Sequence, residues 1–160
     1  MSNYIIRQAL ERDIPRILTL LEDIANIHHI SRPDIFKANS RKYNSDDMKK
    51  ILSDEKTPVF VVTDKDEYVL AYCICMINSV EENPVLYPKN IFFIDDLCVS
   101  EETRGTGLGT KFFEYIKDFA QNLGYIDSIE LNVWEDNPKA IKFYELLGLK
   151  TKKRVLEMPL

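Results

Sequence analysis

The stretch that decides the fold is IDDLCVSEETRGTGLGTKFFEY, residues 94–115. An apolar run with strand character leads into the glycine-rich residues 104–109, and an amphipathic helical pattern follows at once. Glycine allows positive φ angles and lets a ligand approach the backbone closely. Consecutive N–H groups of such a turn form an anion site, to which the start of the helix adds its positive dipole end. We therefore predict that residues 104–110 bind a phosphate or pyrophosphate, with Arg104 as a charged partner.

Two common phosphate-binding motifs do not fit this loop. A Walker A loop ends in Gly-Lys-Ser/Thr, whereas Gly109 is followed by Thr110 and Lys111. A dinucleotide-binding fingerprint that began at Gly105 would need a glycine at Thr110, and it usually lies in the first strand–helix unit of a chain. On these residues alone, a glycine-rich turn without a ligand remains an alternative.

Strand-like and helix-like patterns alternate on both sides of the loop. We expect strands at residues 4–7, 58–63, 68–80, 91–99 and 129–134, and a polar edge strand at 150–159. We expect helices at residues 14–25 after Asp13 as N-cap, at 45–52 with Ser45 as cap, at 108–123, and at 138–147 after Asn137 as N-cap. This order predicts an α+β fold around one sheet.

Length and composition agree with one soluble globular domain. The chain has 160 residues, of which 45% are hydrophobic and 29% charged, and no apolar run approaches the ~20 residues of a membrane span. The first residues lack the pattern of a secretory signal. The net charge of −5 argues against nucleic acid as the main partner and is compatible with a cationic substrate. Cys73, Cys75 and Cys98 lie in apolar runs without metal or redox spacing, so we expect buried reduced thiols in a cytoplasmic protein.

Two segments together resemble the GNAT superfamily of N-acetyltransferases. The residues Arg104-x-x-Gly107-x-Gly109 match the acetyl-CoA signature Q/R-x-x-G-x-G/A, and NPKAIKFYELLGL, residues 137–149, matches the second family block N-x-x-A-x-x-F-Y-x-x-x-G-F. The resemblance implies a GNAT-type acyl-CoA N-acyltransferase fold with a single mixed, mostly antiparallel sheet flanked by helices, in one domain over residues 1–160. It implies acetyl-CoA as co-substrate and no metal. The acceptor would be a small polyamine-like amine or a peptide amine, and the fold allows a homodimer.

The resemblance also implies roles for individual residues. The backbone of Leu97, Cys98 and Val99 would pair with the pantetheine arm like an added strand. The pyrophosphate would bind to the loop formed by Arg104, Gly105, Thr106, Gly107, Leu108, Gly109 and Thr110. Asn137 would contact the pantetheine, although it is equally suited to capping a helix. Tyr144 would lie near the sulfur and act as general acid for the departing thiolate, with core packing as its alternative role.

Asp95 is the candidate general base. An alkylammonium has a pKa of about 10.4, so the amine must lose a proton before it attacks. Asp95 and Asp96 interrupt an otherwise apolar strand, where an unpaired carboxylate is costly, and Asp95 shares strand parity with Leu97. Polyamine acetyltransferases of the superfamily carry an acid at the matching place, whereas the Glu of the ribosomal-protein acetyltransferases is replaced here by Asn132. The alternative is a structural acid bound to a backbone N–H or to a lysine.

Other residues and functions remain open. His28 and His29 follow the first helix, in the region that borders the acceptor pocket in this superfamily, and Trp134 and Tyr43 are further candidates for its lining. Cys98 has no neighbouring His, so we expect direct transfer without an acyl-enzyme. Two further interpretations are a non-catalytic acyl-CoA sensor and an acyltransferase that uses a different acyl-CoA, such as succinyl- or propionyl-CoA.

Overall fold

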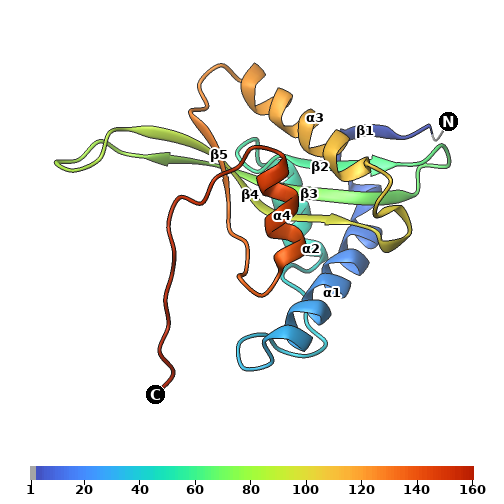
Figure 1. Ribbon diagram of the computed structural model, residues 1–160. Helices are drawn as coiled ribbons and strands as arrows, with labels where there is room; N and C mark the ends of the chain where they lie inside the picture. The colour runs from blue at the N-terminus through green and yellow to red at the C-terminus, as the bar shows by residue number, and fades with distance from the viewer. Residues whose placement is uncertain (1–2) are drawn as a thin grey trace.

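A computed structural model describes residues 3–160, which form a five-stranded sheet with helices on both faces (Figure 1). The strands are β1 (Ile5–Gln8), β2 (Val59–Thr63), β3 (Val69–Val80), β4 (Lys89–Val99) and β5 (Ser128–Leu131). The helices are α1 (Ile14–Ser31), α2 (Ser45–Ser53), α3 (Leu108–Asn122) and α4 (Pro138–Leu146), with 3-10 turns η1 (Glu11–Asp13) and η2 (Glu101–Thr103). The strand order is β1-β2-β3-β4-β5, antiparallel up to β4 and parallel between β4 and β5. The predicted α+β fold with a mixed, mostly antiparallel sheet is confirmed.

The sheet separates two apolar clusters. On one face, α3 packs against the sheet through a cluster that includes Leu108, Phe112, Ile116, Phe60 and Phe92. On the other face, α1 and α2 pack through a cluster that includes Ile17, Leu21, Met48, Val61 and Ile74. Successive residues of β2 enter opposite clusters because side chains alternate along a strand. Each fully buried side chain of this kind contributes roughly 1.5–3 kcal/mol, so both faces are firmly attached. Among residues 3–160, no helix is long and apolar enough to cross a membrane.

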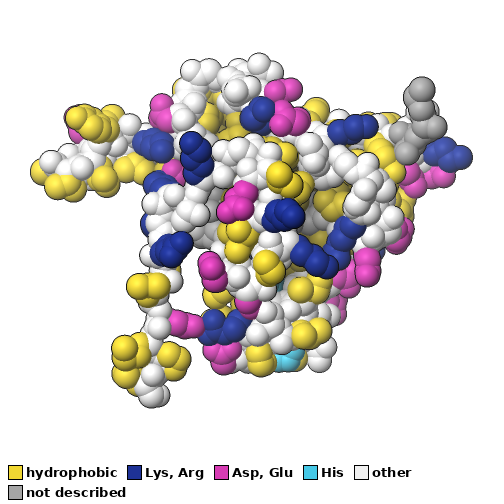
Figure 2. Space-filling view, viewed as in Figure 1, with side chains coloured by type: hydrophobic (Ala, Val, Ile, Leu, Met, Phe, Trp, Pro, Cys, Tyr) yellow, Lys and Arg dark blue, Asp and Glu magenta, His cyan; other side chains and the backbone are white. Residues whose placement is uncertain are grey.

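The prediction of an edge strand at residues 150–159 is wrong. That segment is extended but joins no ladder in the described part of the chain, and it runs away from the body with its hydrophobic side chains exposed (Figures 1 and 2). A strand exists only where its N–H and C=O groups meet a neighbour. The adjacent β5 ends at Leu131, short of the expected residue 134, and gives this segment little edge to pair with.

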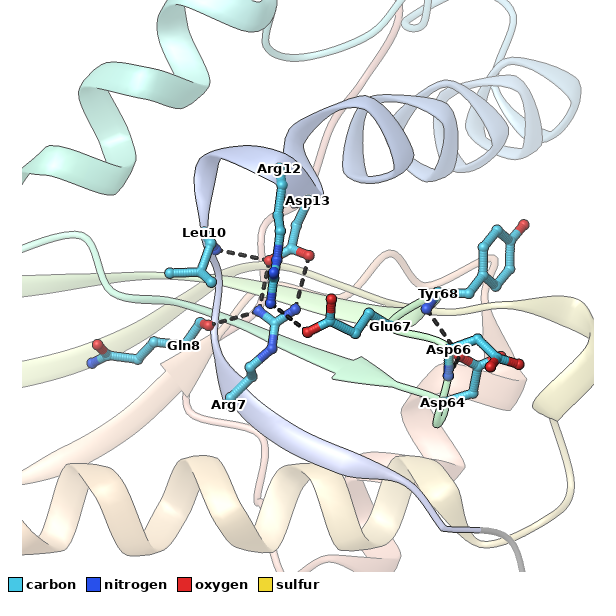
Figure 3. Close-up of polar contacts among 9 residues, drawn as sticks. All are labelled: Arg7, Gln8, Leu10, Arg12, Asp13, Asp64, Asp66, Glu67 and Tyr68. Atoms are coloured by element: carbon cyan, nitrogen blue, oxygen red, sulfur yellow. Dashed lines mark hydrogen bonds and ion pairs between the residues drawn. The ribbon is translucent and has the colours of Figure 1, made fainter.

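The start of α1 also differs from the prediction that Asp13 caps it. The Asp13 carboxylate turns back, accepts a hydrogen bond from the Leu10 N–H at 2.8 Å, and pairs with both terminal nitrogens of Arg7 at 2.7 and 3.0 Å (Figure 3). Burial alone would raise the pKa of Asp13, but the hydrogen bonds from Arg7 and Leu10 outweigh burial and lower it. Asp13 therefore joins β1 to the short η1 turn instead of capping α1.

The cap of α2 lies one residue before the expected Ser45. The Asn44 side chain accepts from the Asp47 N–H at 2.9 Å, and the Asp47 carboxylate accepts from the Asn44 N–H at 3.0 Å. This reciprocal arrangement is a capping box, which satisfies two donors that the helix itself leaves unpaired. It fixes the end of the loop at residues 32–44, which carries part of the site described next.

Candidate functional site

The last residues of β4 have one open edge. The ladder between β4 and β5 runs only as far as Ile94, whereas β4 continues beside β3 to Val99. At the same point Ile94 and Asp96 pair with consecutive residues of β3, so Asp95 is the extra residue of a β-bulge. The bulge bends β4 where β5 ends. Residues 95–99 are left without a strand neighbour on that side within residues 3–160.

The backbone groups of Leu97 and Val99 point to this open edge. The Ser100 N–H donates to a β3 carbonyl at 2.8 Å, and alternate residues of an antiparallel strand face the same neighbour. The backbone of Cys98 therefore also bonds to β3. Of the three residues expected to pair with the pantetheine arm, only Leu97 and Val99 have backbone groups that face the open edge. The Val99 carbonyl accepts from Nε of Arg104 at 3.2 Å. An extended ligand with amide groups can add to such an edge as a further strand.

The open edge leads directly into the glycine-rich loop. Gly105 and Gly107 have φ angles of 78° and 82°, which other residues rarely adopt. Gly107 precedes α3, whose first backbone hydrogen bond runs from Lys111 to the Gly107 carbonyl at 3.2 Å. The N–H groups of residues 108–110 come before this bond and point out of the helix end, where the helix dipole is positive. This is the geometry of an anion site.

Gly109 allows the second motif to reach the first. A Cβ atom at Gly109 would lie 3.3 Å from Phe143 Cζ and 3.7 Å from Val99 Cγ2, the first of which is closer than ordinary contact. The missing side chain lets α4 place Phe143 against the start of α3. At the other end of the motif, the Asn137 side chain accepts from the Ala140 N–H at 3.2 Å and caps α4.

Tyr144 lies near the open edge. Its ring packs at 64° to the ring of Phe143, with the centroids 5.2 Å apart. Burial raises the pKa of the Tyr144 phenol, and the nearby Cys73 and Asp96 raise it further. Cys73 pairs with Leu97 across β3 and β4, which puts the phenol beside the part of β4 that β5 leaves uncovered. The phenol is therefore protonated at neutral pH and able to donate.

Asp95 is a paired acid. Its two oxygens accept from Lys42 Nζ and from the Tyr43 hydroxyl, each at 2.7 Å, and its side chain is 11% exposed. The prediction that Asp95 lies on the same face of the strand as Leu97 and Val99 is wrong. The bulge turns Asp95 toward the loop before α2, while Leu97 and Val99 pack in the α3 cluster. The lysine contact is the structural alternative that the sequence left open.

Asp96 is a functional candidate that sequence reasoning did not single out. Burial raises its pKa to about 6; Lys42 opposes this shift and Asp95 adds to it. The Tyr72 hydroxyl lies nearby without completing a hydrogen bond to any described residue. A carboxyl of this kind exchanges its proton near neutral pH, which suits a general base. Its position in an apolar strand was visible in the sequence, but the bulge that buries it was not.

The burial of Asp96 leads to a prediction about how the free energy of unfolding depends on pH. In the folded protein its pKa of about 6 exceeds the ordinary value of about 3.9, so the folded state retains a proton that the unfolded state loses between these pH values. Ionisation above pH 6 then costs the folded state about 2–3 kcal/mol. Asp96→Asn carries no such cost, so its free energy of unfolding relative to wild type should rise from pH 4 to pH 7.5 in urea titrations.

Asp13→Asn is the matched control for this measurement, because the Asp13 carboxylate pairs with Arg7 and its pKa is lowered in the folded protein. It should show no such relative gain with pH. A difference between Asp96→Asn and wild type that stayed constant from pH 4 to pH 7.5 would show that Asp96 ionises equally easily in the folded and unfolded chains.

Aromatic side chains join the end of α1 to the segment after β5. His28 stacks on Phe36 at 4.8 Å, and Phe36 contacts the edge of Trp134 at 5.1 Å. His29 Nδ1 lies 2.7 Å from the Phe36 carbonyl oxygen, so the two histidines contact the ring and the backbone of the same residue. Burial lowers the pKa of His28, an effect that Asp136 partly offsets. Three of the residues suspected of lining an acceptor pocket thus meet around Phe36, on the same loop that brings Tyr43 to Asp95.

The cysteines are buried and free. Burial raises the pKa of Cys98 to about 12, so its thiol does not supply a thiolate at neutral pH. This agrees with the expectation that Cys98 is not an acyl carrier.

A separate pocket of about 420 Å³ lies beside α1 and η2. Its lining includes Asp23, Glu101 and Glu102, with Arg16 as a basic member. Three carboxylates would repel a phosphate, so this pocket does not compete with the glycine-rich loop as an anion site.

Comparison with known proteins identifies relatives of this arrangement. The sequence profile of the acetyltransferase (GNAT) family matches residues 21–149. The structure is similar to that of a mutant of the BH1408 protein from Bacillus halodurans, with 32% identity, a TM-score of 0.93, and coverage of 98% of this chain and 99% of that one. It is also similar in fold to an aminoglycoside acetyltransferase from an uncultured soil metagenomic sample, with 16% identity, a TM-score of 0.70, and coverage of 98% and 95%. The probable N-acetyltransferase san of Drosophila melanogaster is 35% identical over 83 residues, which span 52% of this chain and only 42% of that protein.

Proposed function

The chain belongs to the GNAT acetyltransferase family, and from this premise we propose that it transfers the acetyl group of acetyl-CoA to a primary amine by direct attack in a ternary complex. One observation carries the proposal: Tyr144 lies near the open edge of β4, and that edge leads into the glycine-rich loop. An extended ligand that contains amides, a pyrophosphate and a thioester would find a matching partner at each position.

The proposed contacts to acetyl-CoA follow from this geometry. The N–H and C=O groups of Leu97 and Val99 pair with the pantetheine amides, as in strand addition. The N–H groups of residues 108–110 hold the pyrophosphate, and Arg104 supplies a positive charge. Asn137 uses its side-chain oxygen to cap α4, which leaves its NH₂ group free to donate to a pantetheine carbonyl.

The reaction then needs two proton transfers. The neutral amine attacks the thioester carbonyl, and the C–S bond breaks as the tetrahedral intermediate collapses. Tyr144 donates its proton to the departing sulfur, and the aspartates of the bulge take or relay the proton that the amine gives up. Asp95 remains our first candidate for that base. Asp96 is the second candidate, because Lys42 and Tyr43 already bind both Asp95 oxygens.

Asp95→Asn should lower kcat/KM about 100-fold at pH 7 and less as the pH rises. Near the amine's own pKa of about 10.4 much of the acceptor is already deprotonated and needs no base. Initial rates between pH 6.5 and 9.5 would show this recovery, and Asp96→Asn measured in parallel would show which carboxyl carries it.

Two other profiles would assign Asp95 differently. An equal loss at all pH values together with a lower Tm would make Asp95 a structural partner of Lys42. A higher KM for the acceptor at constant kcat, with a salt dependence, would limit Asp95 to attracting a cationic acceptor.

The function itself is tested by release of free CoA with a panel of amines. Polyamines come first because the chain is acidic overall and has Asn132 where a Glu would favour ribosomal-protein substrates, followed by amino acids, aminoglycosides and N-terminal peptides. We expect release from acetyl-CoA with at least one amine. Tight CoA binding without release for any amine would indicate an acyl-CoA sensor, and a preference for propionyl- or succinyl-CoA would indicate a different donor. We place this activity in the cytoplasm, because the buried cysteines are free thiols.

A further inference from the structure

The Lys42 side chain holds a primary amine against the candidate general base. Its Nζ lies 2.7 Å from Oδ1 of Asp95 and 5.6 Å from the centre of the Tyr43 ring, and the Tyr43 hydroxyl donates to the other Asp95 oxygen at 2.7 Å. The side chain of Asp95 is 11% exposed and that of Lys42 is 47% exposed. The carboxylate is therefore fixed at the bulge of β4, whereas the amine remains within reach of a ligand.

This amine lies close to the other groups that acetyl transfer needs. Asp95 stands two residues before Leu97, whose backbone groups face the open edge of β4. Lys42 opposes the rise in the pKa of Asp96, and Asp96 in turn raises the pKa of Tyr144, so these three groups lie within electrostatic range of one another. The amine, the carboxylates and the phenol thus gather at the end of the open edge, where the thioester lies in the proposed complex with acetyl-CoA.

Lys42 enters from the acceptor side of the site. It belongs to the loop at residues 32–44, which also carries Phe36 with its contacts to His28 and Trp134. His28 and Trp134 are two of the residues expected to line the acceptor pocket. A cationic acceptor would bring its own ammonium to the same carboxylate, so the Lys42 side chain occupies the position of such an acceptor.

We propose that Lys42 is a site of self-acetylation, at which the chain's own lysine takes the acetyl group of bound acetyl-CoA. This inference rests on the proposed function, because it uses the same donor site and the same acid. One proton of the ammonium passes to Asp95, and Nζ then attacks the thioester carbonyl carbon. The N–C bond forms, the C–S bond breaks, and its electron pair leaves with the sulfur. Tyr144 protonates the sulfur, and the second proton lost by Nζ restores the phenol, so the products are acetylated Lys42 and free CoA.

The test is incubation of the wild-type chain with acetyl-CoA alone, followed by intact mass measurement and peptide mapping. We expect a gain of the mass of one acetyl group on Lys42, with a rate constant that does not change with protein concentration, because the reaction is intramolecular. Lys42→Arg should abolish the modification, and Tyr144→Phe should slow it about 10–100-fold.

Lys152 provides the matched control. It pairs with Glu130 at the same distance of 2.7 Å and its side chain is 61% exposed, so accessibility alone would favour Lys152 over Lys42. Lys152 should stay unmodified, and Lys152→Arg should gain the acetyl group on Lys42 at the wild-type rate. Equal modification of both lysines, at a rate that Tyr144→Phe does not change, would overturn the proposal, because it would indicate chemical acetylation of exposed amines. A rate constant proportional to protein concentration would overturn it as well, since the reaction would then run between two chains.

The same samples separate this proposal from the proposed function. Release of CoA with an added amine while Lys42 stays unmodified would overturn self-acetylation alone. Acetylation of Lys42 without release for any added amine would support self-acetylation and limit the activity to the chain's own lysine. Neither modification nor release would overturn both.

Discussion

Tyr144→Phe should lower kcat about 10–100-fold and leave the Kd for acetyl-CoA nearly unchanged. The substitution removes only the hydroxyl, so the ring still packs against Phe143 and α4 still meets the start of α3. The lost interaction is one that forms as the sulfur leaves, which is why kcat falls and ground-state binding does not. The effect is at the small end of general acid catalysis because a thiol of ordinary pKa, about 8.5, is already a fair leaving group.

Steady-state rates at saturating acetyl-CoA and calorimetric titration with CoA separate the two quantities. Tyr125→Phe, which removes a hydroxyl from an exposed tyrosine outside the site, is the matched control and should keep full kcat. Retention of full activity in Tyr144→Phe would leave Tyr144 with the packing role that the sequence also allowed. Loss of CoA affinity as large as the loss of kcat would place the hydroxyl in cofactor binding instead.

The glycine-rich loop was predictable because its features are local. Positive φ angles at Gly105 and Gly107 and a helix that begins at Leu108 depend on a few consecutive residues, and the structure has both. The same holds for α4, whose start is fixed by Asn137 and whose end lies just before Gly148, at φ 93°. Local backbone preferences decide these positions, so one sequence is enough to read them.

The chemistry of the two aspartates was not predictable in the same way. Which of Asp95 and Asp96 is paired and which is buried depends on the bulge, and the bulge exists because β3 and β4 slip by one residue against each other. Such a shift reverses the faces of the residues that follow it, as Leu97 and Val99 show. The pairing of Asp95 with Lys42 and Tyr43 comes from a loop more than fifty residues earlier. The pattern of apolar residues within 91–99 does not predict that contact.

The prediction of a strand in the C-terminal segment was wrong for a related reason. Its alternating side chains do favour a strand, but a strand is a property of two segments, and β5 stops at Leu131 without offering an edge of sufficient length within the same chain. A sequence pattern can therefore favour a strand where the chain offers no neighbouring strand for it to pair with.

Gly107→Asp should raise the KM for acetyl-CoA about 100-fold with little change in the KM for the acceptor. The loop acts through N–H groups at a positive helix end, and charge-assisted hydrogen bonds of this kind contribute about 1.5–3 kcal/mol. A carboxylate at the same place opposes the pyrophosphate, and a loss of that size corresponds to about 10–150-fold in affinity. A side chain at Gly107 has room, since nothing lies within 4 Å of a Cβ there, so the fold should survive.

The positive φ of 82° at Gly107 adds a separate cost, which Gly107→Asn measures. Asparagine has the same shape as aspartate, tolerates the left-handed region and carries no charge, so it should raise the KM tenfold at most. The difference between the two variants isolates the charge, and the pair Arg104→Glu and Arg104→Gln repeats the comparison at the side chain that binds the Val99 carbonyl. At both positions, calorimetric titration with CoA should give a higher affinity for the neutral variant than for the acidic one. Equal CoA affinity in Gly107→Asp and Gly107→Asn would mean that the pyrophosphate does not bind at this loop, because no anion close to residues 107–110 could be indifferent to a full negative charge beside it.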